Sequence, residues 1–356
     1  MLDVTVYDIA REAEVSVSTV SRVLNGTAPV KASTRQKVLA LIEKYQFQPN
    51  GLARSLLKKV TGTIGIVIPD INNPFFPEVF TGAENALREK GYTFFLCTTH
   101  GNFEYESQYL ALLREKQVDG ILFLGGRINQ RHCPPDLAQE LEDLNRRIPI
   151  VLVNGDLPGS SFHRVFIDEH RGAELATQHL IDLGHRHIGF IGGEPEITAT
   201  TEKIAAFEQT LAVNGLSSRP EWMLLGDFSI GCGMRRMEEL LALPERPTAV
   251  FCVNDFVSVG VIKTAFDHGL RIPADIAVVG FDDTVLAAST TPELTTISQR
   301  SKELGETSVR VLLQLIQKRR VRKHTVLEPV LKIRRSTVDG LNAAAGQLSQ
   351  LSEPCG

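Results

Sequence analysis

The feature that most constrains this chain is an alternation, from Thr61 onward, of short apolar runs with stretches of helical periodicity. The apolar runs lie at residues 64–68, 120–124, 149–153, 188–191, 249–253 and 276–281. Continuous apolar runs predict strands that are covered on both faces, as in parallel sheets. Glycines end the intervening helices at Gly91, Gly184, Gly215 and Gly269. The pattern therefore predicts an α/β architecture of repeated βα units and, given the length, two parallel sheets.

The carboxyl ends of these predicted strands mark the expected ligand site, because ligands of parallel sheets collect there. The strand ends carry carboxylate and amide side chains beside phenyl rings, which suits a polyhydroxylated or heterocyclic ligand. Asp282 and Asn254 are predicted to hold hydroxyl groups. Phe76 or Phe228 is predicted to cover an apolar face of the ligand, and Phe75 accompanies Phe76.

The first sixty residues form a separate, basic segment. They hold nine Lys or Arg against five Asp or Glu, a balance of +4, so the remainder carries −8 and the whole chain −4. A chain of 356 residues is also too long for one ordinary core. We therefore expect a small basic module followed by a larger acidic one, and a basic module suits a partner rich in phosphate.

Three short helical patterns follow one another in this basic segment. The first has Thr5 as its N-cap with Asp8 three residues on, and the second begins after Ser16. The third begins at Ser33, with Gln36 in the capping-box position. The apolar faces of the three helices are predicted to close one miniature core.

The second helix presents a polar face made of Ser18, Ser21, Arg22 and Asn25. Small side chains let a helix approach base edges closely, and an arginine there can donate two hydrogen bonds to a guanine. An ordinary solvated helix face has a similar composition. The face alone therefore leaves both interpretations open.

The stretches VTVYDIAREA (4–13) and VSVSTVSRVLNG (15–26) closely resemble the lac/galactose repressor (LacI/GalR) family. The resemblance implies a helix-turn-helix domain over residues 1–49, acting as a homodimer on a palindromic double-stranded DNA operator. It implies that Val17, Ser18 and Arg22 contact bases. It also implies a set that mainly holds phosphates, consisting of Thr5, Ser16, Thr19, Ser21 and Asn25.

One position departs from the family pattern, because Glu14 stands in the turn where the family usually has glycine. If that turn requires a positive φ, a side chain there costs about 1 kcal/mol.

Residues 50–60 carry a short helical pattern with nothing beside it in sequence to pack on, and such a helix is marginal alone in water. In the LacI/GalR family the matching segment forms a hinge helix on DNA and pushes a leucine between base steps of the minor groove. The resemblance therefore implies that Ala53 and Leu56 meet DNA, with Leu56 as the wedge. A plain interdomain linker is the alternative.

The motifs Gly184-His185, Pro247–Phe251 and Thr291–Ile297 match the same family, whose sensor resembles periplasmic sugar-binding proteins. The resemblance implies an effector-binding and dimerisation domain over residues 61–337, with two lobes joined by three crossings. Lobe 1 is expected at about 61–160 and 292–321, and lobe 2 at about 161–291 and 322–337. The family's effector pocket carries an arginine where this chain has Lys203, which lacks the planar fork of a guanidinium.

The resemblance implies a transcriptional regulator, with repression as the expected mode, controlled by a small-molecule effector such as a sugar or sugar derivative. Control by a phosphorylated protein partner is one alternative. A solute-binding protein of a transporter is another, but it requires an export signal, whereas this chain opens on charged and polar residues.

Other classes of function are not expected. The sequence lacks G-x-G-x-x-G, the phosphate-binding G-x-x-x-x-G-K-[ST] motif and a nucleophile elbow, so catalysis is not predicted. The five cysteines are scattered without a C-x-x-C pair, which predicts neither a disulfide framework nor a metal site, and no cofactor is implied. Without a membrane-length apolar stretch, we expect a cytoplasmic protein. Residues 338–356 are interpreted as a disordered tail.

Overall fold

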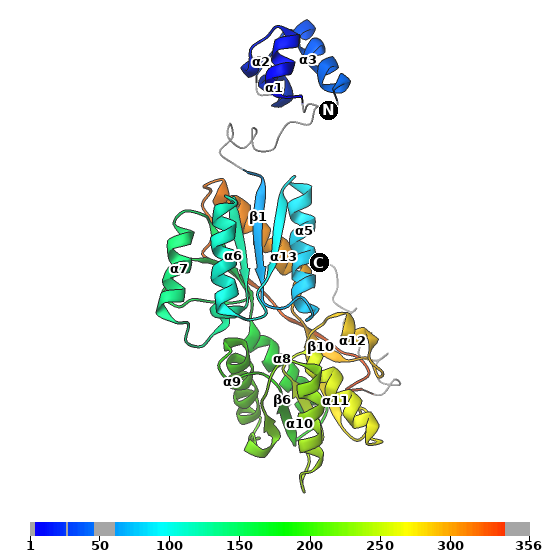
Figure 1. Cartoon of the computed structure of the whole chain (residues 1–356). Helices are drawn as coiled ribbons and strands as arrows, with labels where there is room; N and C mark the ends of the chain where they lie inside the picture. Colours follow the sequence, from blue (N-terminus) through cyan, green and yellow to red (C-terminus); the bar gives the residue numbers. More distant parts are fainter. Residues whose placement is uncertain (1–3, 26–27, 46–60, 339–356) are drawn as a thin grey trace, which may run out of the picture. The chain divides into compact units, whose positions relative to one another are not determined.

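The computed structural model describes residues 4–25, 28–45 and 61–338. The chain divides into an N-terminal unit, residues 1–62, and a C-terminal unit, residues 63–356, each of which is described by itself (Figure 1). The predicted hinge helix at 50–60, with Ala53 and Leu56, lies outside the described residues. So does the predicted tail from residue 339 onward.

In its described residues, the N-terminal unit contains three helices: α1 (Val6–Ala13), α2 (Val17–Asn25) and α3 (Ala32–Lys44). Each helix contributes apolar side chains to one small core. The buried members of this core are Ile9, Ala10, Ala13, Val20, Val23 and Val38. The predicted miniature core is therefore confirmed.

Both ends of α1 can be compared with the expectations from the sequence. Thr5 and Asp8 form both halves of a capping box at the start of α1. At the other end of α1, Glu14 adopts the left-handed conformation with φ 54° and ψ 41°. The turn therefore does require a positive φ, and Glu14 takes a conformation that favours glycine.

The predicted start of the third helix is wrong. Helix α3 begins at Ala32, and its cap position is Lys31, which makes no side-chain capping bond. The amide of Arg35 already donates to the carbonyl oxygen of Lys31 at 3.0 Å. Because that bond draws Ala32 and Ser33 into the first turn, Ser33 lies inside the helix instead of capping it.

The first lobe of the C-terminal unit contains a six-stranded, wholly parallel sheet with the strand order β11-β5-β4-β3-β1-β2. The strands are β1 (Thr63–Ile68), β2 (Thr93–Thr98), β3 (Gly120–Leu124), β4 (Ile150–Val153), β5 (His163–Ile167) and β11 (His324–Leu327). Every residue of β3 and β4 is buried, as expected for strands covered on both faces.

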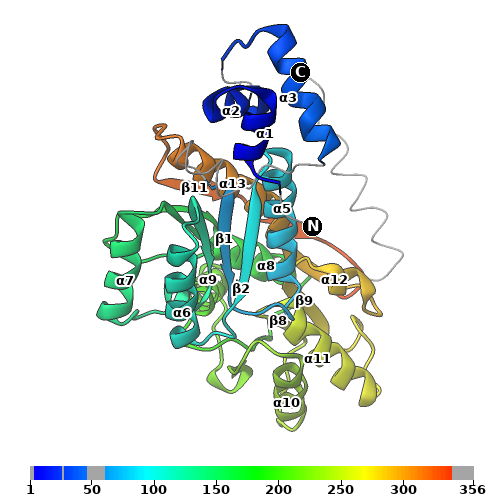
Figure 2. The same ribbon diagram turned by 45° about the horizontal axis from the view of Figure 1, so that its top comes forward.

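Helices cover both faces of this sheet (Figures 1 and 2). On one face lie α5 (Phe75–Glu89) and α13 (Ser301–Ile316), and on the other lie α6 (Phe103–Glu115) and α7 (Pro135–Asn145), with the 3₁₀ helix η1 (Gly126–Asn129) after β3. Helices α5 and α13 approach so closely that a Cβ atom on Gly82 would lie 1.9 Å from the carbonyl oxygen of Lys302. This contact requires glycine.

The second lobe contains a six-stranded sheet with the order β12-β10-β9-β8-β6-β7, parallel except for the edge strand β12. Its strands are β6 (Ile188–Ile191), β7 (Met223–Leu224), β8 (Ala249–Cys252), β9 (Ala277–Asp282), β10 (Thr295–Ser298) and β12 (Val330–Lys332). Its helices are α8 (Glu169–Asp182), α9 (Thr198–Val213), α10 (Ile230–Leu241), α11 (Asp255–Asp267), α12 (Val285–Ser289) and the 3₁₀ helix η2 (Pro220–Trp222).

The fold class predicted from the alternation is confirmed. The six predicted apolar runs correspond to β1, β3, β4, β6, β8 and β9. The four glycines predicted to end helices all have positive φ angles, between 70° and 95°.

The predicted lobe boundaries differ from the structure by several residues at each crossing. Strand β5 still belongs to the first sheet, so the chain leaves lobe 1 after Ile167 and not near residue 160. It returns only after β10, at Ser298 and not at Pro292, and leaves again after Leu327 and not after Val321. The expected borders stopped short because β5, β10 and β11 mix polar with apolar residues, and the longest apolar run among them is the three residues 165–167 of β5.

Candidate functional site

The N-terminal unit carries its candidate residues on and before α2. Ser18 and Arg22 are exposed, whereas Val17 is partly buried against the small core. Ser21 is half-buried on the same helix. Asn25 is the last residue of α2, and its side chain is outside what the structure describes.

A cluster of hydroxyl groups lies at the start of α2. The Ser16 hydroxyl contacts the Ser18 hydroxyl at 2.7 Å and that of Thr19 at 2.9 Å, and it accepts from the Thr19 amide at 3.2 Å. Thr5 is engaged differently, because its hydroxyl donates to the Asp8 carboxylate at 2.6 Å. The exposed arginine and these small hydroxyl side chains give α2 a face that can enter a DNA groove.

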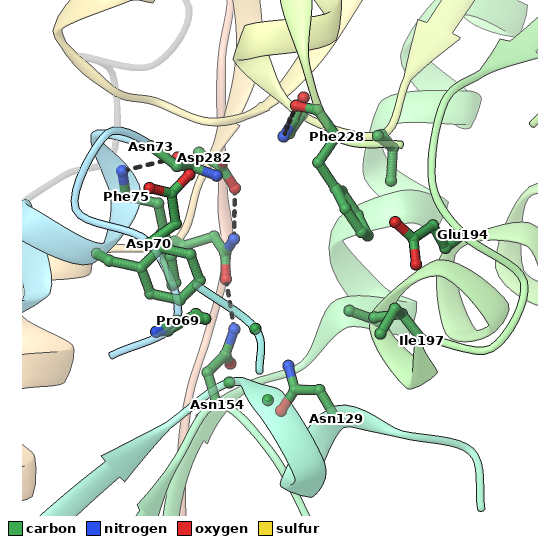
Figure 3. Close-up of a pocket in the computed structure, with 18 of the residues that line it drawn as sticks. Pro69, Asp70, Asn73, Phe75, Asn129, Asn154, Glu194, Ile197, Phe228 and Asp282 are labelled. Carbon is green, nitrogen blue, oxygen red and sulfur yellow. Dashed lines mark hydrogen bonds between the residues drawn. The ribbon is translucent and has the colours of Figure 1, made fainter. Parts of the chain in front are cut away.

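The C-terminal unit contains a cavity of about 610 Å³ between its two lobes. All six residues predicted to bind a ligand line this cavity: Phe75, Phe76, Lys203, Phe228, Asn254 and Asp282. Figure 3 shows that Phe75 and Asp70 come from the segment after β1, while Phe228 and Glu194 lie across the cavity on the other lobe. The site therefore draws on residues that are far apart in the sequence.

Two groups of phenyl rings face the cavity. Phe75 and Phe76 pack edge to face with their ring centroids 5.1 Å apart at the start of α5. The Phe228 ring projects into the cavity from the opposite side (Figure 3). Such rings can cover the apolar faces of a ligand.

The ammonium group of Lys203 forms an ion pair within the protein. Its ammonium group lies 2.6 Å from a carboxylate oxygen of Glu169, and the two side chains are only 5% and 12% exposed. The same ammonium lies 4.0 Å from the centroid of the Phe281 ring. Lys203 is therefore neutralised within the protein.

Asp282 ends β9 at the cavity wall. Its φ is 119°, a backbone conformation that residues other than glycine rarely adopt. Its carboxylate accepts a hydrogen bond of 2.6 Å from the Gln299 amide. Burial, followed by the nearby Asp255 carboxylate, raises the pKa of Asp282 well above its usual range.

Asp255, at the start of α11, supports the turn that follows Asp282. It accepts from the Thr284 amide at 2.7 Å, from the Thr284 hydroxyl at 2.9 Å and from the Thr296 hydroxyl at 2.7 Å. Burial raises the pKa of Asp255 to about 7 in spite of these three donors.

A chain of hydrogen bonds runs from Asp282 across the boundary between the lobes. The side-chain oxygen of Gln299 accepts a hydrogen bond from the side-chain amide of Asn154 at 3.1 Å, and the same amide group donates to the Glu169 carboxylate at 3.1 Å. Asn154 follows β4 of lobe 1, while Glu169 begins α8 of lobe 2. Contacts made at Asp282 are thus connected to the segments that join the lobes.

Sequence reasoning missed Gln299, Asn154 and Glu169, although all three line the cavity. Asn154 directly follows the predicted strand at 149–153, so the strand-end rule could have found it. Gln299 and Glu169 follow β10 and β5, whose apolar runs are at most three residues long and do not mark them as strands. The neighbouring Asp168 accepts from the Arg171 amide at 2.9 Å and caps α8.

Asn254 is partly used by the fold. Its side-chain oxygen accepts from the Val257 amide at 2.8 Å and caps α11, and its amide group donates to the Phe228 carbonyl oxygen at 3.2 Å. This leaves one N–H and one lone pair of the Asn254 side chain for a ligand.

The lobes also touch away from the connecting segments. The Arg131 amide donates to the Glu196 carbonyl oxygen at 2.7 Å, and the Thr198 hydroxyl donates to the Asn129 carbonyl oxygen at 3.1 Å. Elsewhere the Val285 amide donates to the Glu78 carboxylate at 3.3 Å. These contacts hold the two lobes together around the cavity.

In the ranges 4–25, 28–45 and 61–338, no group of three or more His, Cys, Asp or Glu side chains is placed to hold a metal ion. In these same ranges no helix combines the length and apolarity needed to cross a bilayer.

Comparison with known proteins identifies both units. Residues 5–50 match the family model "Bacterial regulatory proteins, lacI family", and residues 177–337 match "Periplasmic binding protein-like domain". The HTH-type transcriptional repressor PurR of Aliivibrio fischeri (strain MJ11) is 36% identical over 340 residues, which cover 95% of this chain and 99% of the relative. The chain belongs to the lacI family of bacterial regulatory proteins.

Other relatives match over almost their whole length. Catabolite control protein A of Priestia megaterium is 37% identical over 339 residues, covering 94% of this chain and 100% of the relative. The crystal structure of the lac repressor dimer bound to operator and the anti-inducer ONPF superimposes with a TM-score of 0.85 at 28% identity, covering 94% and 99% of the two chains. The family resemblance and the fold predicted from the sequence are therefore confirmed.

Proposed function

We propose that this lacI-family protein is a cytoplasmic, sequence-specific DNA-binding repressor whose operator affinity is controlled by a small molecule in the cavity between the lobes. It acts as a homodimer on a palindromic operator and carries out no catalysis. The observation that carries the proposal is the combination, in one chain, of an exposed Arg22-bearing helix with a ligand-sized cavity lined by rings and amides.

On the DNA side, α2 is the recognition helix. Val17, Ser18 and Arg22 contact base edges, and Arg22 supplies the donor pair that reads a guanine. The residues that hold the phosphates are Thr5, Ser16, Thr19, Ser21 and Asn25. Ala53 and Leu56 contact the minor groove, where Leu56 acts as a wedge. The relatives named as repressors and the operator-bound lac repressor dimer support this arrangement.

On the ligand side, we propose a sugar or sugar derivative. Phe75, Phe76 and Phe228 cover its apolar faces, while Asp282, Asn254 and Lys203 provide polar contacts. A ligand can change operator affinity only if it binds one arrangement of the lobes better than the other. The hydrogen-bond chain from Asp282 to Glu169 gives such a ligand a route to the segments that join the lobes.

Selection from a pool of random duplexes tests the DNA-binding part. The purified full-length chain should enrich a palindrome with two half-sites, as expected for a dimer that reads each half with one α2 helix. Recovery of duplexes without any shared sequence would overturn the proposal.

The nature of the effector is tested separately. A small-molecule effector should raise the melting temperature of the protein alone, because a ligand that binds only the folded state stabilises it by mass action. Control by a phosphorylated protein would instead leave the protein unresponsive to metabolites and would require that partner for any change in operator affinity.

A further inference from the structure

The charges around the cavity are strongly unbalanced. Among the described residues, the acidic side chains that line it belong to Asp70, Glu169, Glu194 and Asp282, and the raised pKa of Asp282 favours its uncharged form. In the same set, Lys203 is the sole Lys or Arg. His100 also lines the cavity, but it lies exposed at the start of the loop after β2. An anionic ligand would therefore meet carboxylates on both lobes and one ammonium group.

That ammonium group is already committed. Lys203 and Glu169 are both almost buried, 2.6 Å apart, and the Phe281 ring occupies another side of the ammonium at 4.0 Å. A phosphate group that bonded to a remaining N–H of Lys203 would lie beside the buried Glu169 carboxylate, and one that replaced Glu169 would leave that carboxylate without its partner. Removing one member of a buried ion pair is strongly unfavourable.

The remaining polar groups match hydroxyls. A hydroxyl group both donates and accepts, so it can serve a carboxylate and an amide at once. Asn129 provides a specific position for one, because its side-chain amide nitrogen is directed toward the cavity, while its side-chain oxygen is buried against Gly155. Figure 3 shows Asn129 on the cavity wall near Asn154, across from Phe228.

We propose that the cavity selects an uncharged polyhydroxylated ligand and rejects the phosphate ester of the same compound, with Glu169 as the residue that determines this specificity. The inference rests on the proposed function and narrows its ligand class. Glu169 acts by neutralising Lys203, the one cation that the cavity could offer a phosphate among its described residues.

The test uses the full-length protein and matched pairs of probes. Glucose, fructose, ribose, trehalose and adenosine are each titrated beside their own phosphate ester, with the melting temperature and calorimetric binding as readouts. For any pair that binds, the uncharged member should bind on the order of 100-fold more tightly, given the cost of unpairing a buried charge.

Glu169→Gln frees Lys203 while keeping the shape of the side chain. This variant should shift the ratio of the two affinities at least about tenfold toward the phosphate ester. The double variant Glu169→Gln/Lys203→Met removes both charges and serves as the matched control, in which the ratio should stay near that of the wild type. Melting temperatures without ligand establish that each variant is folded.

Equal or tighter binding of the phosphate ester by the wild type would overturn the inference while leaving the proposed function intact. An unchanged ratio in Glu169→Gln would overturn the role of Glu169. If no probe of either kind binds, the small-molecule part of the proposed function is contradicted, and the inference is contradicted with it.

Discussion

The two units of this protein place their functional side chains in opposite environments. In the N-terminal unit, Ser18 and Arg22 lie on the surface of one helix above a core of six buried residues. In the C-terminal unit, Asp282, Gln299 and Lys203 are buried and already hydrogen-bonded or ion-paired. The exposed face needs only a stable helix beneath it, whereas the cavity depends on groups that hold one another in place. Substitutions should therefore affect the two units differently.

The largest expected effect is on a buried ion pair of the C-terminal unit. The Arg127 guanidinium is fully buried, lies 2.6 Å from both Glu106 and Glu140, and also bonds to Ser107. Arg127→Met should cost about 3–5 kcal/mol of unfolding free energy, because it leaves the buried Glu106 without its partner. Urea denaturation followed by the fluorescence of Trp222, the sole tryptophan, measures this cost.

The N-terminal unit supplies the matched contrast. Arg11 pairs with Asp8 at 2.8 Å on the surface, with its side chain 77% exposed. Arg11→Met should leave the stability of its unit nearly unchanged, since solvent screens such pairs. A double variant, Arg127→Met/Glu106→Gln, should recover part of the loss. Similar costs for Arg127→Met and Arg11→Met would contradict the contrast between the units.

The second effect concerns DNA reading. Arg22→Ala should weaken operator binding by about 1–3 kcal/mol and flatten base preference at one position of each half-site, because a two-pronged contact to guanine is lost. Stability should hardly change, since Arg22 is exposed. Selection from random duplexes reads out the preference, with exposed Arg35 of α3 as the control substitution Arg35→Ala. An unaltered base preference would show that Arg22 does not contact a base.

A third effect separates the units by pH. The pKa of Asp255 is raised from 3.8 to about 7, so the fold favours its protonated form. The stability that Asp255 contributes is full below pH 3.8 and is lost as the pH rises through 7. The melting temperature of Asp255→Asn relative to the wild type should therefore increase from pH 4 to pH 7. The corresponding difference in unfolding free energy should grow by at most about 1.4 kcal/mol per pH unit.

Asp8 of the N-terminal unit should behave in the opposite sense. The Thr5 hydrogen bonds lower the pKa of Asp8 below 3.8, so its contribution is present above that pH and is lost in more acidic solution. Asp8→Asn should accordingly show no trend between pH 5 and pH 8. A melting-temperature difference between Asp255→Asn and the wild type that stays constant from pH 4 to pH 7 would refute the protonation of Asp255.

The smallest effect tests the strained turn of the N-terminal unit. Glu14 has φ 54°, so Glu14→Gly should stabilise this unit by about 1 kcal/mol. Glu14→Ala removes the 3.2 Å contact with Lys37 but keeps a Cβ atom, and it should bring no such gain. Thermal melting followed by circular dichroism compares the two variants. A gain in Glu14→Ala equal to that in Glu14→Gly would assign the effect to the side chain and not to the backbone.

The same contrast explains what could be predicted from the sequence. Helical periodicity predicts the helices of the N-terminal unit, and continuous apolar runs predict the six buried strands. Residues such as Phe228 and Asp282 are predicted because ligands bind at the carboxyl ends of parallel strands. Local patterns do not reveal pairs that meet only in three dimensions. Nothing near Lys203 in the sequence indicates that Glu169 neutralises it, and nothing near Asn154 indicates the contact with Gln299, 145 positions further along the chain.

Control by an effector requires a coupling between the cavity and the operator, and one measurement tests this coupling directly. The dissociation constant of the selected operator is measured by fluorescence anisotropy with and without a saturating sugar that binds the cavity. We predict a change of about 5–150-fold, and the operator must change the affinity for that sugar by the same factor. A sugar that saturates the cavity while the operator affinity stays constant would contradict the account.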